Sequence, residues 1–199
     1  RDSITTINEN YTHPEMPNDC EEGIIKGMYV LSDNESYDVR LLGSGAILRE
    51  ALKAKDILFK FKIKAQVWSV TSFNLLRKDG MEIERYNQLN PSGKQKLTYV
   101  EECFSDSNVP VIAATDYMRS YAEQIRPYIH SSYTTLGTDG YGRSDSRQTL
   151  RDFFEVDSKS IARAAIYALY KNDKIDKNQI ENYYKELGID SNKPNPWEI

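Results

Sequence analysis

The sequence contains few of the residues that mark metal sites, disulfide frameworks or membrane spans. Its two cysteines, Cys20 and Cys103, and its two histidines, His13 and His130, are widely separated. That spacing predicts neither a zinc site nor a disulfide framework, and scattered serines beside two histidines do not specify a catalytic triad. No apolar run approaches the ~20 residues that a helix needs to cross a bilayer. We therefore expect neither a metal centre nor a membrane protein.

Charge of one sign is also missing from any long stretch. The chain has 26 Lys and Arg against 30 Asp and Glu, a formal net charge of −4. Nucleic acids and anionic membranes are excluded as expected partners, because both require concentrated positive charge. No secretory signal pattern opens the chain, so a cytoplasmic protein is expected. The first residue is Arg1 rather than methionine, which suggests a piece of a longer polypeptide.

Short apolar runs alternate with segments of helical period after the prolines at positions 14 and 17. This pattern predicts one α/β domain with three layers, in which helices cover both faces of a mostly parallel sheet. The expected strands are residues 27–31, 39–42, 65–70, 109–114 and 133–136. The expected helices cover residues 47–58, 73–89 and 117–125, a stripe over 161–169 after Asp157 or Ser158 as N-cap, and a last segment between Asp176 and Gly188.

Two glycines, Gly43 and Gly45, flank Ser44 between an expected strand and an expected helix. Backbone amides at such a point can hold a phosphate. However, the third glycine of a dinucleotide fingerprint is replaced by Leu48, and no acidic residue near position 65 is placed to bind a ribose. A tight strand-to-helix turn is the favoured interpretation.

The loop at residues 137–145 follows the last expected strand and leads into a helix near Ser146. Loops at the carboxyl ends of parallel strands are where ligands bind in open α/β sheets. The candidates for an anion-binding or interface loop are Asp139, Gly140, Arg143, Ser144 and Asp145. The alternative is a sharp connection in which Ser144 or Asp145 caps the helix and Asp145 pairs with Arg143 or Arg147.

Seven motifs say more about the relationship of this chain to known families than its composition does. In chain order they are EEGIIKGMY (21–29), LLGSGAILR (41–49), WSVTSF (68–73), ATDYM (114–118), AEQIR (122–126), LGTDGYGRSDSR (136–147) and FEVD (154–157). Together they resemble the C-terminal region of the homodimeric, thiamine-diphosphate-dependent first component of pyruvate dehydrogenase, a transketolase-like family. The resemblance runs in order from about residue 7 to the end.

This resemblance implies a domain organisation and a chemistry for the whole enzyme. Residues 1–17 would be the end of a pyrimidine-binding domain plus a linker, and residues 18–199 a transketolase C-terminal-like domain. Its five-stranded sheet would be mostly parallel with one antiparallel edge strand. The intact homodimer would decarboxylate pyruvate with thiamine diphosphate and Mg²⁺. It would then acetylate the lipoyl group of the dihydrolipoyl acetyltransferase component.

The chain lacks the family's Gly-Asp-Gly motif and the glutamate that contacts the coenzyme. No catalytic, cofactor-binding or metal residue is therefore assigned, and no cofactor is expected in this chain by itself. We expect a domain that serves subunit assembly and exposes an apolar patch to its partner domains. Asn8, Glu9 and Asn10 stand where transketolase has a segment that recognises sugar phosphate, and they are candidates for the active-site entrance. The alternatives are a stand-alone anion-binding module using residues 137–145 and an oxidoreductase using Gly43 and Gly45.

Overall fold

The computed structural model describes residues 14–33, 36–105 and 108–198. Within them one sheet is formed by β1 (Met28–Ser32), β2 (Val39–Ser44), β3 (Ala65–Val70), β4 (Val111–Ala114) and β5 (Tyr133–Leu136). The strand order is β1-β3-β2-β4-β5. β1 runs antiparallel to β3, and the other neighbours are parallel. The predicted mostly parallel sheet with one antiparallel edge strand is confirmed.

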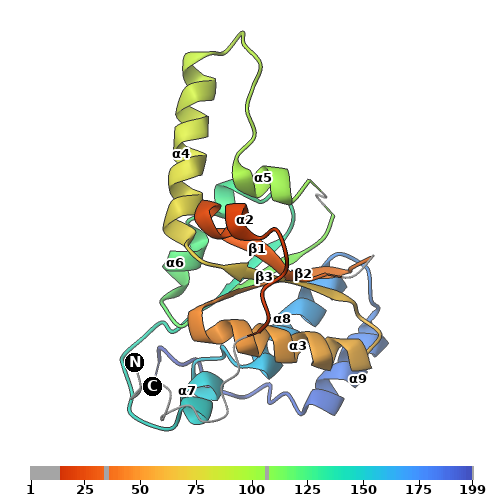
Figure 1. Cartoon of the computed structure of the whole chain (residues 1–199). Coiled ribbons are helices and arrows are strands. Elements are labelled where there is room, and N and C mark those ends of the chain that lie inside the picture. Colours follow the sequence, from red (N-terminus) through yellow and green to blue (C-terminus); the bar gives the residue numbers. More distant parts are fainter. Residues whose placement is uncertain (1–13, 34–35, 106–107, 199) are drawn as a thin grey trace.

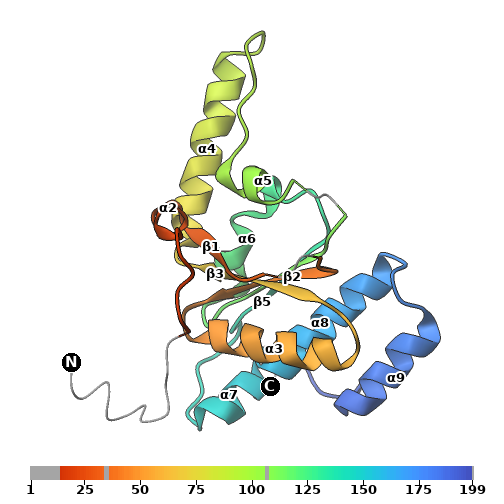
Figure 2. The same cartoon turned by 45° about the vertical axis from the view of Figure 1, so that its right-hand side comes forward.

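Helices cover both faces of this sheet, as Figures 1 and 2 show. One face packs against α3 (Leu48–Lys60) and α8 (Ser158–Lys171), and α9 (Lys177–Leu187) packs against α8 and extends the same core. The other packs against α4 (Phe73–Leu89), α5 (Tyr99–Cys103) and α6 (Arg119–Glu123). The sheet thus separates a first core, on the side of α3 and α8, from a second core, on the side of α4, α5 and α6. Along β4, Ile112 and Ala114 face the first core, whereas Val111 and Ala113 face the second. This alternation follows from the two-residue period of a strand, and it explains why the buried strands are apolar throughout.

Most predicted helices are confirmed, some to the residue. α4 covers the predicted 73–89, and α8 and α9 begin directly after Asp157 and Asp176, whose side chains accept hydrogen bonds from Ser160 N and Gln179 N. α9 ends at Gly188 in the left-handed conformation. The sequence did not predict the short helices α2 (Glu21–Lys26) and α5, or the 3₁₀ turns η1 (Gly45–Ile47) and η2 (Arg126–Tyr128). Such short elements carry too little periodicity to be recognised.

Several predicted boundaries differ from the observed ones by one or two residues, and local contacts explain three of the differing starts. β1 begins at Met28 because Gly27, with φ of 116°, ends α2. β4 begins at Val111 rather than 109, and Pro110 has no N–H to donate to a sheet. The helix expected over 117–125 is only Arg119–Glu123, because Thr115 Oγ1 accepts a hydrogen bond from Tyr117 N at 3.2 Å and holds the preceding residues in a turn.

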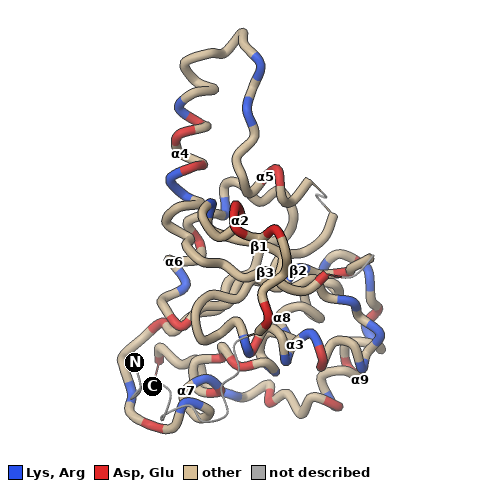
Figure 3. Tube along the Cα trace, in the orientation of Figure 1, with Lys and Arg blue, Asp and Glu red and all other residues tan. Residues whose placement is uncertain are grey.

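Charges of both signs are interspersed over the surface (Figure 3). Among the helices that the structure describes, none combines the length and the apolar character that a membrane span requires. α7 (Arg147–Phe153) lies below the sheet, beside the loop that follows β5.

Candidate functional site

The carboxyl ends of the four parallel strands form one edge of the domain. Ser44 of β2 pairs with Val70 of β3, and Gly43 pairs with Ala114 of β4. Ala114 pairs in turn with Leu136 of β5. β3 and β4 lie on opposite sides of β2. The chain therefore leaves β2 toward one edge of the sheet and leaves β4 toward the other, and the order of the strands reverses between β2 and β4. Ligands of open α/β sheets bind outside this point.

A cavity of about 350 Å³ lies at this point. Apolar side chains, Ile47, Leu150, Phe154 and Val156, form part of its lining. The polar lining consists of Asp116, Thr138, Arg143, Arg147 and Arg151. Three guanidinium groups and one carboxylate thus border its apolar surface, and the guanidinium of Arg151 already pairs with Glu50 Oε1 at 2.9 Å.

The structure brings only part of the predicted loop to this cavity. Gly140 and Arg143 line it, whereas Asp139 interacts with Arg119. Ser144 and Asp145 lie outside the lining, and Asp145 accepts a hydrogen bond from Ser146 N at 2.6 Å. The N-cap prediction was wrong by one or two residues, because Ser146 itself accepts from Thr149 N at 3.2 Å and caps α7. The other candidates, Asn8, Glu9 and Asn10, lie outside the described residues.

The turn between β2 and α3 is filled by the protein itself. A Cβ on Gly43 would lie 2.6 Å from the Cα of Leu48, so glycine is required for α3 to approach the strand. Gly45 has a φ of 57°, and its α-carbon faces the carboxylate of Asp116, 3.4 Å from where a Cβ would stand. The prediction of a tight strand-to-helix turn is confirmed.

Residues 115–119 and 137–140 are locked together by hydrogen bonds. Thr138 N donates to Tyr117 O at 2.8 Å, and Arg119 N donates to Asp139 Oδ1 at 3.0 Å. The guanidinium Nε of Arg119 forms an ion pair with Asp139 Oδ2 at 3.5 Å. Gly137 allows the two segments to touch, since a Cβ there would lie 2.6 Å from Arg119 N. These loops therefore have a defined shape.

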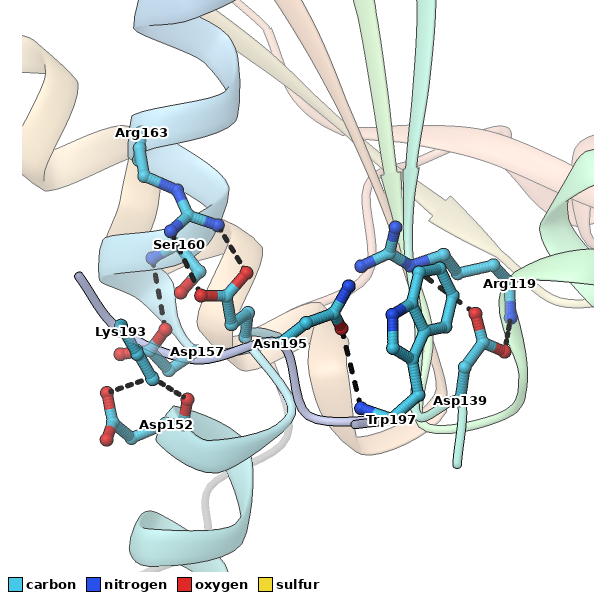
Figure 4. A network of polar contacts seen from close by, with 10 residues as sticks. Arg119, Asp139, Asp152, Asp157, Ser160, Arg163, Lys193, Asn195 and Trp197 are labelled. Carbon is cyan, nitrogen blue, oxygen red and sulfur yellow. Dashed lines mark hydrogen bonds and ion pairs between the residues drawn. The ribbon is translucent and has the colours of Figure 1, made fainter. Parts of the chain in front are cut away.

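The C-terminal tail joins the same edge (Figure 4). The Trp197 ring lies 5.2 Å from Arg119 Cζ, and Trp197 Cα is 3.3 Å from where a Cβ on Gly140 would stand. Earlier in the tail, Lys193 Nζ pairs with Asp152 Oδ1 of α7 at 3.2 Å and anchors the tail to that helix. The sequence predicted only an irregular tail. Trp197, the one aromatic residue after Gly188, was the clearest signal that this tail packs against the domain.

We call residues 115–119, 137–141 and 195–197 the edge platform. Its outer side chains are exposed: Tyr141 by 86%, Tyr117 by 64%, Met118 by 58% and Trp197 by 50%. Tyrosine, tryptophan, methionine and arginine are the residues enriched in protein interfaces. A rigid platform carrying these side chains is suited to binding another protein surface, because little entropy is lost in ordering it.

A buried carboxylate supports the cavity from behind. Glu50, 5% exposed, accepts hydrogen bonds from Arg151 NH1 at 2.9 Å, Ser158 N at 3.0 Å and Lys53 Nζ at 3.1 Å. Burial opposes its ionisation, but the charges and hydrogen bonds of these three groups outweigh burial and lower the pKa of Glu50. Arg151 is thereby held at the cavity wall.

No cluster of three or more His, Cys, Asp or Glu side chains able to hold a metal ion occurs among the residues that the structure describes.

From the sequence we did not predict that Tyr117, Met118, Tyr141 and Trp197 lie on the surface. Aromatic residues beside buried strands are as readily expected in the core as on the surface.

Comparison with known proteins agrees with the fold. Transketolase from Leishmania mexicana superimposes with a TM-score of 0.54 and 19% identity, covering 75% of this chain and 19% of that one. A transketolase mutant from Pichia stipitis gives a TM-score of 0.55 and 20% identity, covering 81% of this chain and 21% of that one. At these identities the similarity shows the fold alone.

Sequence relatives are much closer. The chain is 52% identical over 198 residues to a protein of Pseudomonas aeruginosa named "Pyruvate dehydrogenase E1 component", covering 97% of this chain and 22% of that protein. It is 45% identical over 197 residues to the protein of the same name from Escherichia coli K12, again covering 97% and 22%. The chain thus spans about a fifth of the length of these relatives. Residues 27–157 match the family described as "Transketolase-like TK C-terminal domain", and the chain belongs to that family.

Proposed function

We propose that this chain is the C-terminal domain of the first component of a pyruvate dehydrogenase complex. The observation that carries the proposal is the 52% identity over 198 residues to a relative named pyruvate dehydrogenase E1 component. The intact enzyme would be a cytoplasmic homodimer that uses thiamine diphosphate and Mg²⁺ to decarboxylate pyruvate. It would pass the acetyl group to the lipoyl group of the dihydrolipoyl acetyltransferase component. In such enzymes the coenzyme supplies the electron sink, and the protein orients it.

Among the described residues, the two glycine turns do not fit the diphosphate of thiamine diphosphate. At the first glycine turn, α3 occupies the space beside Gly43 that a phosphate would need. The carboxylate of Asp116 faces the corresponding space beside Gly45. At the second glycine loop, the space beside Gly140 is occupied by Trp197. A diphosphate beside a carboxylate would be repelled. We therefore expect other parts of the enzyme to hold the coenzyme.

The domain's own contribution is assembly through the edge platform. Asp139 and Gly140 are already engaged in holding Arg119 and Trp197, so we assign residues 137–145 to an interface rather than to a small-anion site. The division between linker and domain at residue 17 remains a prediction.

The proposal predicts that the 199-residue chain by itself does not bind the coenzyme. Calorimetric titration of the chain with thiamine diphosphate and Mg²⁺ is expected to give no saturable heat at micromolar coenzyme. The intact polypeptide is expected to bind the coenzyme and to release carbon dioxide from pyruvate. Saturable micromolar binding by the chain alone would contradict the assignment, and an intact polypeptide inactive on pyruvate would contradict the enzyme function.

A further inference from the structure

β1 forms one edge of the sheet, and a groove runs along its open side. Among the strands that the structure describes, β1 has a neighbour on one side only, β3. α2 and α5 lie beside this edge (Figures 1 and 2), and residues of both helices line a groove of about 510 Å³. Tyr29, Val30 and Leu31 all line the groove as well. Because successive side chains of a strand point to opposite faces, a groove that touches all three lies along the backbone at the edge of the sheet.

The backbone of Val30 faces this groove. Thr71 N donates a hydrogen bond to Gly27 O at 2.9 Å, on the side of β3. In an antiparallel pair the hydrogen-bonding groups of successive residues alternate between the two sides of a strand, so those of Met28 and Val30 point away from β3. The hydroxyl of Tyr99 in α5 confirms this direction, because it donates to Met28 O at 3.0 Å. Val30 is therefore the next residue whose N–H and C=O are directed away from the sheet.

Contacts among the lining residues fix the shape of the groove. Where α2 approaches α5, a Cβ on Gly23 would lie 3.2 Å from the Tyr99 hydroxyl. Beyond the end of β1, Asp33 Oδ1 accepts a hydrogen bond from Gln66 Nε2 at 2.7 Å. Gln66 Oε1 accepts in turn from Trp68 Nε1 at 2.8 Å, and Trp68 is buried in the second core. A partner that binds here would lose little entropy in ordering the groove.

The charge of the groove indicates the kind of partner. Its described lining includes the carboxylates of Asp19, Glu22 and Asp33 but no Lys, Arg or His. Glu22 pairs with Lys26, one helical turn further along α2, at 2.7 Å, and 77% of its side chain is exposed. The Lys26 ammonium also lies 4.8 Å from the centre of the Tyr99 ring. A basic side chain is therefore attracted to this edge and an acidic one repelled.

We propose that a short, extended, basic segment of a partner protein binds along β1 as an added strand, with its backbone paired to Val30 and a Lys or Arg side chain against Asp19 and Glu22. Main-chain hydrogen bonds give such a strand its affinity, and the side chains around it give specificity. The register of β1 against β3 shifts between Val30 and Ser32, so the regular edge is short and the segment needs only a few residues. The groove has a volume typical of ligand sites, which span about 300 to 1,000 Å³. This role goes beyond the proposed function, because it involves neither the edge platform nor the reaction of pyruvate.

Fluorescence anisotropy of a labelled peptide with the intact polypeptide tests the proposal. The probe is fluorescein-labelled Val-Lys-Val-Arg-Val-Thr, and its matched control peptide carries Glu in place of Lys and Arg. We expect saturable binding of the basic peptide and at least about tenfold weaker binding of the acidic one, because the groove repels a like charge. No saturable binding of the basic peptide, or equal binding of the two peptides, would overturn the proposal.

Removing two charges from the groove shows where the peptide binds. Asp19→Asn combined with Glu22→Gln is expected to raise the dissociation constant of the basic peptide at least about tenfold. Asp173→Asn combined with Glu181→Gln is the matched control, outside the groove lining. Asp173 and Asp19 share a left-handed φ, 55° and 59°, and each glutamate pairs with a lysine at i,i+4. Equal effects of the two double substitutions would contradict binding in this groove.

N-methylation of the basic peptide tests strand pairing and covers the case in which the groove variant fails to fold. One peptide is methylated at the backbone nitrogens of its odd positions, and a second at those of its even positions. An added strand donates from alternate residues only, so one peptide is expected to bind at least about tenfold more weakly and the other to retain its affinity. Equal affinities of the two would rule out an added strand. None of these readouts involves pyruvate turnover, so their failure would leave the proposed function untouched.

Discussion

Replacing Glu50 with alanine is expected to lower the free energy of unfolding by about 3 kcal/mol. The substitution removes the acceptor of Arg151 NH1 and of the Ser158 amide at the start of α8. Arg151 is only partly exposed, with 22% of its side chain accessible, so it would retain a charge with no counter-ion at that position. Leaving one partner of a buried pair uncompensated is more costly than the pair is stabilising. Urea denaturation at neutral pH measures the change.

Glu181→Ala is the control for this substitution. Glu181 forms an exposed pair with Lys177 at 3.7 Å, and such surface pairs contribute about 0.5 kcal/mol or less. Equal effects of the two substitutions would show that burial of Glu50 does not matter.

The Glu50 effect also has a defined pH dependence. The folded pKa of this carboxyl lies below its ordinary value of 4.5, so its stabilisation is fully present above about pH 4.5 and is lost as the pH falls through the lower folded value. The difference in stability between the native chain and Glu50→Gln should therefore be constant near neutral pH and shrink in acid. A difference that grows in acid would contradict the direction of the shift.

Replacing Gly43 with alanine is expected to destabilise the domain by about 2 to 3 kcal/mol. The new Cβ would lie 2.6 Å from Leu48 Cα and 3.2 Å from Ala51 Cβ. The closest of these atoms is backbone, so β2 and α3 would have to separate rather than a side chain rotate. The loss exceeds the gain of about 0.4 to 1 kcal/mol that Gly→Ala gives by restricting the unfolded chain.

Gly142→Ala is the matched control, because no atom lies within 4 Å of where its Cβ would stand. This variant is expected to be as stable as the native chain, or slightly more stable, in thermal denaturation. If Gly43→Ala behaves in the same way, Gly43 is not needed for close packing and the interpretation of this turn is wrong.

The Gly43 turn shows what could be predicted from the sequence. Apolar runs and helical stripes indicate where strands and helices begin, because burial on both sheet faces selects for them. The replacement of a fingerprint glycine by Leu48 correctly favoured a structural turn, and Asp157 and Asp176 correctly marked the starts of α8 and α9. These signals are local, so they can be read without knowing the fold.

The candidate site depends on contacts between distant residues, and the sequence gives little indication of them. Asp139 was one candidate of an anion-binding or interface loop, and its carboxylate accepts a hydrogen bond from the backbone of Arg119, twenty positions earlier in the chain. Trp197 reaches Arg119 because the tail runs from Lys193, which pairs with Asp152 of α7, to the loop at Gly140. α4 was predicted with the right limits, yet periodicity alone did not show that its outer half leaves the core.

The edge platform is proposed to bind another part of the enzyme. Hydroxyl-radical footprinting with mass spectrometry measures it directly, because Tyr117, Met118, Tyr141 and Trp197 all react readily when exposed. These four side chains should be oxidised several-fold more slowly in the intact polypeptide than in the 199-residue chain. Exposed Phe59 of α3 serves as the internal reference. Equal oxidation of the four platform residues in both samples would contradict the account.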